Sequence, residues 1–113
     1  MRIGIVGSRN FNNYSFFQIC LDELNLDIST IISGGVIGAD TLAERYAKEN
    51  DIELLVLKPE WNKYGKGAGF IRNTQIVNES EMIIAFWDGE SNGTRDTISK
   101  AKKKDIPVKI FYF

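Results

Sequence analysis

The chain has no histidine and only one cysteine, Cys20, among its 113 residues. Without histidine, neither a Ser–His nor a Cys–His nucleophile pair is available. A single cysteine makes no internal disulfide, and the lack of histidine argues against a structural zinc site, so we expect no bound metal. Long apolar runs are missing too, because no stretch approaches the ~20 residues of a membrane span. We therefore expect no contact with a membrane.

The chain also lacks an excess of charge of either sign. Its 14 basic and 15 acidic residues give a net charge of −1. Nucleic-acid-binding domains usually carry a basic excess, so this balance argues against nucleic acid as a partner. The first residues, Met1 to Ile5, are typical of a strand rather than a signal peptide. We therefore expect an intracellular, cytoplasmic protein.

Strand-like and helix-like segments alternate along the whole chain. The predicted strands are residues 2–6, 30–33, 53–57, 82–87 and 108–113, with amphipathic or helix-opening segments between them. This alternation predicts an α/β fold: one three-layer, Rossmann-like domain over residues 1–113 with a five-stranded, mostly parallel sheet. Right-handed crossovers favour the strand order 3-2-1-4-5.

Three predicted strands end in turns of small and polar residues. These turns contain Gly7-Ser8-Arg9, Ser33-Gly34-Gly35 with Gly38, and Asp88-Gly89 with Gly93 and Thr94. The carboxyl ends of parallel strands share one edge of the sheet, so we expect the turns to face a single ligand. The second and third turns each lead into a predicted helix, and the N-terminus of a helix suits phosphate. The glycines of the second turn are predicted to hold a phosphate, and Gly93 with Thr94 a second anionic group.

Further candidate contacts lie outside these glycines. Ser8, Arg9 and Arg72 are predicted to add hydrogen bonds and charge, because arginine suits bidentate contact with phosphate. Residues 58–68 show no periodicity and are predicted to form a loop. Trp61 and Tyr64 in this loop are either a lid over the site or two anchors that hold the loop on the sheet.

Four ordered motifs carry a family resemblance over nearly the whole chain. They are Gly7-Ser8-Arg9-x-Phe11, Ser33-Gly34-Gly35-x-x-Gly38-Ala39-Asp40, Gly69-Phe70-Ile71-Arg72-Asn73 and Trp87-Asp88-Gly89-x-Ser91-x-Gly93-Thr94. The pattern resembles the YspA-like branch of the SLOG superfamily, which joins the DNA-processing protein DprA and the Lonely Guy phosphoribohydrolases. The resemblance implies a Rossmann-like fold that binds a nucleotide or nucleotide-derived ligand, such as one from NAD or ADP-ribose metabolism. It also implies a homo-oligomer.

Together, the turns and the resemblance give one set of candidate ligand-binding residues. The set is Gly7, Ser8, Arg9, Ser33, Gly34, Gly35, Gly38, Asp40, Arg72, Asn73, Asp88, Gly89, Ser91, Gly93 and Thr94. No cofactor is assigned, and a nucleotide or NAD-derived molecule is the expected ligand.

The resemblance also bears on catalysis. The Lonely Guy motif P-G-G-x-G-T-x-x-E matches Gly93-Thr94, but Thr97 stands where the catalytic glutamate belongs. Binding is therefore favoured over hydrolysis. Two alternatives stay open. One is N-glycosidic hydrolysis of a nucleotide, with Asp40, Arg72 or Asp88 as catalytic candidates. The other is DprA-like binding of single-stranded nucleic acid, with Trp61 and Tyr64 as stacking residues.

Overall fold

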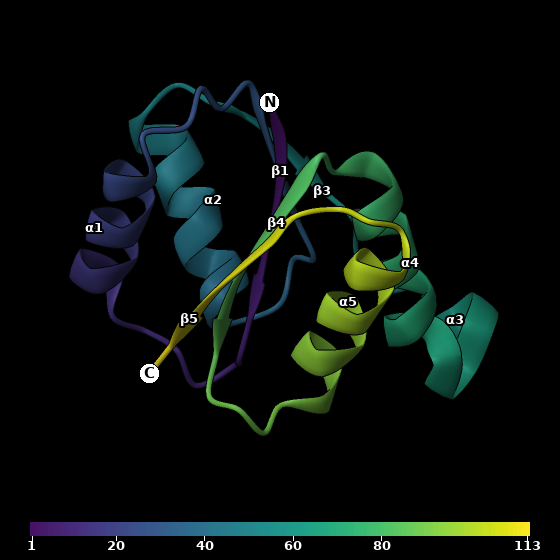
Figure 1. Cartoon of the computed structure of the whole chain (residues 1–113). Coiled ribbons are helices and arrows are strands. Elements are labelled where there is room, and N and C mark those ends of the chain that lie inside the picture. Colours follow the sequence, from purple (N-terminus) through teal and green to yellow (C-terminus); the bar gives the residue numbers. More distant parts are fainter.

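Five strands form one sheet that has helices on both faces, in a computed structural model that describes residues 1–113 (Figure 1). The strands are β1 (Arg2–Gly7), β2 (Thr30–Ser33), β3 (Glu53–Val56), β4 (Met82–Trp87) and β5 (Val108–Tyr112). The helices are α1 (Tyr14–Leu24), α2 (Ala39–Glu49), α3 (Trp61–Tyr64), the 3-10 turn η1 (Gly65–Gly67), α4 (Ala68–Glu79) and α5 (Asn92–Lys103). None of them is long and apolar enough to cross a membrane.

The sheet has the order β3-β2-β1-β4-β5, and each pair of neighbours is parallel. This confirms the predicted order 3-2-1-4-5. The chain adds strands in one direction up to β3 and then returns to the other side of β1 with β4. In the β1–β4 register, Gly7 lies opposite Phe86, so the two strands end side by side. Ligands of open parallel sheets bind outside the carboxyl ends at such a reversal.

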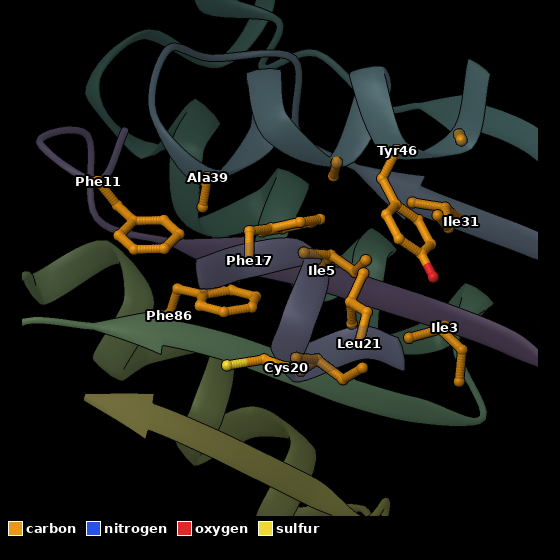
Figure 2. Close-up of a cluster of buried hydrophobic side chains, with 13 residues drawn as sticks. Ile3, Ile5, Phe11, Phe17, Cys20, Leu21, Ile31, Ala39, Tyr46 and Phe86 are labelled. Carbon is orange, nitrogen blue, oxygen red and sulfur yellow. The ribbon is translucent and has the colours of Figure 1, made fainter. Parts of the chain in front are cut away.

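Helices α1 and α2 cover one face of the sheet with an aromatic core (Figure 2). The ring of Phe86 from β4 stacks against the rings of Phe11 and Phe17, at centroid distances of 4.9 and 4.7 Å. Cys20 lies buried in the same cluster, as expected of a packing thiol. Ala39, the first residue of α2, is fully buried here, which fixes the start of that helix beside the end of β1.

Helices α4 and α5 cover the opposite face. Ile76 and Val77 of α4 and Ile98 of α5 pack with Ile83 of β4 in a second apolar cluster. Strand β4 is buried on both faces because it runs through the centre of the sheet, which explains its uninterrupted apolar sequence. The two helices lie side by side and both begin at the edge where β1 and β4 end (Figure 1).

Residues 58–68 differ from the prediction of a loop. They contain α3 and η1, and the backbone N–H groups of Lys63 and Tyr64 both donate to the carbonyl of Glu60 at 3.0 Å. Elements of four and three residues are too short for a helical period to appear in the sequence. The prediction of an irregular segment was therefore wrong in detail, although no long element lies there.

Candidate functional site

A polar pocket of about 430 Å³ opens at the carboxyl ends of β1 and β4. It is lined by ten of the predicted residues: Gly7, Ser8, Arg9, Asp40, Arg72, Asn73, Asp88, Ser91, Gly93 and Thr94. Val6, Asn10, Val36, Ile76 and Thr97 complete the lining. The pocket thus draws on the turns after β1, β2 and β4 and on α4 and α5.

The turn after β1 forms the floor of the pocket. Ser8 is buried, and its backbone N–H donates to the carbonyl of Phe86 at 2.9 Å. Its hydroxyl accepts a hydrogen bond from the backbone N–H of Asp88 at 3.2 Å, which ties this turn to the turn after β4. Arg9 is exposed and has no hydrogen bond or ion pair within the chain. Its guanidinium group is therefore available to a ligand.

The glycine-rich turn after β2 already holds an anion of its own. The buried carboxylate of Asp40 accepts a hydrogen bond from the backbone N–H of Val36 at 3.2 Å. The N–H of Gly35 donates to the hydroxyl of Ser33 at 3.4 Å. These backbone donors thus have partners within the chain. Ser33, Gly34, Gly35 and Gly38 do not line the pocket.

Burial raises the pKa of Asp40 to about 6, against the opposing effects of its backbone hydrogen bonds and of Arg72. A carboxyl group without its hydration shell is harder to ionise, and the donors around Asp40 offset only part of that penalty. The group consequently titrates near neutral pH while it faces the pocket.

Gly38 brings the turn after β2 against the turn after β1. Its φ is +94°, a region that residues with a side chain rarely adopt. A Cβ at this position would lie 2.5 Å from the carbonyl oxygen of Ser8 and 2.7 Å from the Cα of Arg9. The glycine is thus required for close packing of two backbones.

Arg72 reaches from α4 into the pocket and joins this helix to the turn after β2. Its Nη1 donates to the carbonyl of Gly34 at 2.6 Å, and its Nε donates to Asn73 at 3.1 Å. Burial lowers the pKa of the guanidinium, an effect that the Asp40 carboxylate opposes. Arginine nevertheless stays charged in proteins. Its Nη2 has no acceptor within the chain and is free to bind a ligand.

The turn after β4 leads into α5 and leaves backbone donors free. The carboxylate of Asp88 accepts from the backbone N–H groups of Glu90 and Ser91 at 2.9 and 2.8 Å. These bonds lower the pKa of Asp88. The next three N–H groups, those of residues 92–94 in the first turn of α5, have no acceptor within the chain. A helix start of this kind binds anions.

Asn73 orients the start of α5. Its side-chain amide donates to the carbonyl of Gly93 and to the carboxylate of Asp96, both at 3.2 Å. Thr97 is buried, and its hydroxyl donates to the same Gly93 carbonyl at 3.3 Å. The Thr97 hydroxyl group thus makes a hydrogen bond within α5, and this residue brings no carboxylate to the pocket. The carboxylates that do line it, Asp40 and Asp88, are both engaged by backbone N–H groups.

Three further predicted residues lie outside the pocket lining. Gly89 forms the tip of the turn after β4, with φ +84° and open space around it. Trp61 and Tyr64 lie on α3, where 53% and 38% of their surfaces are exposed. Asn10 and Val36 were missed by sequence reasoning, although each lies within a turn that the sequence did single out.

Comparison with known proteins gives a family and a shared fold. The model of the YspA, cpYpsA-related SLOG family (YAcAr) matches residues 1–64. The Gene 61 protein of Mycobacterium phage D29 is 34% identical over 116 residues, which cover 95% of this chain and 93% of that protein.

Two solved structures of DNA processing protein A, DprA, are similar. The protein from Helicobacter pylori, described for its unique single-stranded DNA binding mode, matches with a TM-score of 0.75 and 23% identity over 97% of this chain. The protein from Streptococcus pneumoniae matches with a TM-score of 0.78 and 20% identity over 96%. The chain spans 64% and 49% of those two proteins, so the likeness establishes the fold.

These neighbours correct one prediction. The charge balance argued against nucleic acid as a partner, but the same fold belongs to a protein that binds single-stranded DNA. The exclusion is wrong because net charge averages over the whole surface, whereas binding depends on the local distribution of charge.

Proposed function

The chain belongs to the YspA, cpYpsA-related SLOG family, and we propose that its pocket binds one nucleotide unit by the phosphate. The observation that carries this proposal is the start of α5, where three backbone N–H groups without acceptors adjoin a pocket that also contains Arg9 and Arg72. Helix N-termini and guanidinium groups both bind phosphate in proteins.

The remaining lining suits the sugar and base of a nucleotide. A volume of about 430 Å³ lies within the range of small-ligand pockets. Ser91, Asn10 and the carboxylate of Asp88 offer hydroxyl, amide and carboxylate groups to sugar hydroxyls or base edges. Nucleotide derivatives related to NAD or ADP-ribose belong to the same class of ligand and are to be tested with simple nucleotides.

Hydrolysis of the bound nucleotide has less support. The position of the Lonely Guy glutamate is Thr97, which hydrogen-bonds within α5. The two carboxylates in the lining already accept backbone hydrogen bonds, which reduces their ability to activate water.

Single-stranded DNA is a second form in which the nucleotide unit can arrive. It is favoured by the structural likeness to the Helicobacter pylori protein, which binds single-stranded DNA. A pocket for one phosphate and one sugar is compatible with a free nucleotide and with a residue of an oligonucleotide. Comparing the affinities for the two kinds of ligand distinguishes these forms.

The test is the Arg9→Gln variant, measured by calorimetry with thymidine 5′-monophosphate and with thymidine. Arg9 has no partner within the chain, so its replacement leaves the fold intact. We expect affinity for the monophosphate to fall by about tenfold, as for the loss of one charged hydrogen-bond donor, and affinity for thymidine to stay unchanged.

The matched control is Lys103→Gln. Lys103 is also an exposed basic residue whose side chain has no hydrogen bond or ion pair within the chain, but it lies outside the pocket lining, in the last turn of α5. Equal affinities of the wild-type protein for the phosphorylated and unphosphorylated ligands would refute the proposal. So would equal losses in the Arg9 and Lys103 variants.

A further inference from the structure

Outside the pocket, three aromatic side chains are exposed on α3 and at the start of α4. Trp61, Tyr64 and Phe70 are exposed by 53, 38 and 50%. We call these three the aromatic surface. Large exposed aromatic groups in one small region of a protein surface mark an interaction site.

The aromatic surface is held in place by local contacts. The ring of Trp61 lies 3.6 Å from the position that a Cβ would take at Gly69, so it packs on the bare backbone of α4. The Nζ of Lys100 lies 5.8 Å from the ring centroid of Phe70 and donates to that residue's carbonyl oxygen at 2.6 Å. The Nζ of Lys63 lies 5.1 Å from the ring centroid of Tyr64. Aromatic faces are thus presented together with ammonium groups.

The same segment differs from the rest of the chain in charge. Residues 58–72 contain four basic residues, Lys58, Lys63, Lys66 and Arg72, and one acidic residue, Glu60. The rest of the chain is acidic in balance, with ten basic and 14 acidic residues. The segment therefore carries a local basic excess, which attracts a polyanion.

Residues of α4 and α5 link the aromatic surface to the pocket. Phe70 precedes the pocket residue Arg72 by two positions in α4. Lys100 forms an ion pair with Asp96 at 2.9 Å, and Asp96 accepts a hydrogen bond from the pocket residue Asn73. In Figure 1, α3 projects from the body of the protein beside α4.

We propose that the aromatic surface stacks the bases of a single-stranded nucleic acid, one of whose nucleotides occupies the pocket. This inference rests on the proposed function of the pocket and adds the surface that holds the rest of the strand. Aromatic faces stack on any base, and neighbouring lysines bind the phosphates between the bases. Contact between two copies of this chain through the aromatic surface is disfavoured, because it would bring two basic segments together.

The test measures binding of thymidine 5′-monophosphate and of fluorescent oligothymidylates of about 4 to about 16 nucleotides. Wild-type affinity is expected to rise with length. Trp61→Ala and Phe70→Ala should each weaken oligonucleotide binding by about five- to tenfold and leave monophosphate binding unchanged. Lys63→Gln and Lys66→Gln should each make the logarithm of affinity less salt-dependent, by a slope of about 0.7. The control is Ile19→Ala, which removes an exposed apolar side chain from α1, on the other face of the sheet.

The outcomes separate this inference from the proposed function. If the monophosphate binds but affinity does not rise with length, or if Trp61→Ala and Phe70→Ala lose no more than Ile19→Ala, the stacking surface is refuted and the pocket proposal stands. If neither the monophosphate nor any oligonucleotide binds, both are refuted. A change of sedimentation in the aromatic variants, with unchanged oligonucleotide affinity, would assign the surface to self-association instead.

Discussion

Two glycine-containing turns lie at the same edge of the sheet, each after an inner strand and before a helix, yet they contribute differently to the pocket. In the turn after β2, the backbone N–H of Val36 donates to the protein's own Asp40. After β4, Asp88 binds two N–H groups, and the three that follow in the first turn of α5 have no acceptor. The N–H groups of residues 39–41, in the first turn of α2, likewise have no acceptor within the chain. The two turns differ instead in their place at the pocket, because Gly93 and Thr94 of α5 line it and Gly34, Gly35 and Gly38 do not.

The glycines in the two turns also differ, in their backbone conformation and in how closely other atoms approach them. Gly38 has a positive φ and lies against the backbone of the turn after β1. Gly93 has no positive φ and no atom within 4 Å of the position of a Cβ. The first turn is thus built to join two parts of the fold, whereas the second is open toward the pocket. The predictions below test this contrast.

The largest effect is expected for Gly38→Ala. The added methyl group meets the carbonyl oxygen of Ser8 at 2.5 Å, and alanine is strained at φ +94°. Backbone strain and overpacking together should lower the free energy of unfolding by about 4 kcal/mol. Urea unfolding followed by circular dichroism measures the loss. A loss below about 1 kcal/mol would show that the turn adapts and that the two turns are equally tolerant.

The next effect is the pH dependence of stability in Asp40→Asn. The pKa of Asp40 is raised from 3.8 to about 6 in the folded protein. A raised pKa means that the folded protein holds this proton more tightly than the unfolded chain. The wild type should therefore lose roughly 3 kcal/mol of stability as pH rises from below the lower value to above the higher one. The Asp40→Asn variant lacks this titration. The free energy of unfolding of the variant should therefore rise relative to that of the wild type as pH increases over the same interval.

Asp88→Asn provides the matching variant in the other turn. Backbone hydrogen bonds lower the pKa of Asp88, so its contribution to stability is present above its unfolded pKa and is lost as pH falls through the folded one. The two variants should thus shift the pH profile of stability in opposite directions. Urea midpoints measured from about pH 2 to about pH 8 test this, because the Asp88 contribution is lost only below its ordinary pKa of 3.8. Parallel profiles for wild type and Asp40→Asn would contradict the account of the turn after β2.

The fold could be predicted because it depends on patterns that neighbouring residues set. The continuous apolar run of β4 and the regular alternation of strands and helices were sufficient for the order β3-β2-β1-β4-β5. The edge of the sheet that carries the site followed from that order. The short helix α3 was not predictable, because its four residues make a single turn.

The detail of the site could be predicted only in part. Which residues face the pocket depends on contacts between distant parts of the chain, such as the bond from Arg72 to Gly34 across 38 positions. The sequence assigned a phosphate to the turn after β2, since nothing in it reveals that Asp40 folds back on the N–H of Val36. An acidic residue in the first turn of a helix is compatible with capping the turn and with facing solvent.

The smallest effect is expected for Gly93→Ala, which tests the open turn directly. Gly93 lies in the first turn of α5, and alanine loses less conformational entropy in a helix than glycine does. Since a Cβ at this position meets no atom within 4 Å, stability should rise by about 0.5 kcal/mol, opposite in sign to Gly38→Ala. The same urea measurement detects the shift. A loss of stability comparable to that of Gly38→Ala would show that the start of α5 is as tightly packed as the turn after β2, and the contrast between the two turns would fail.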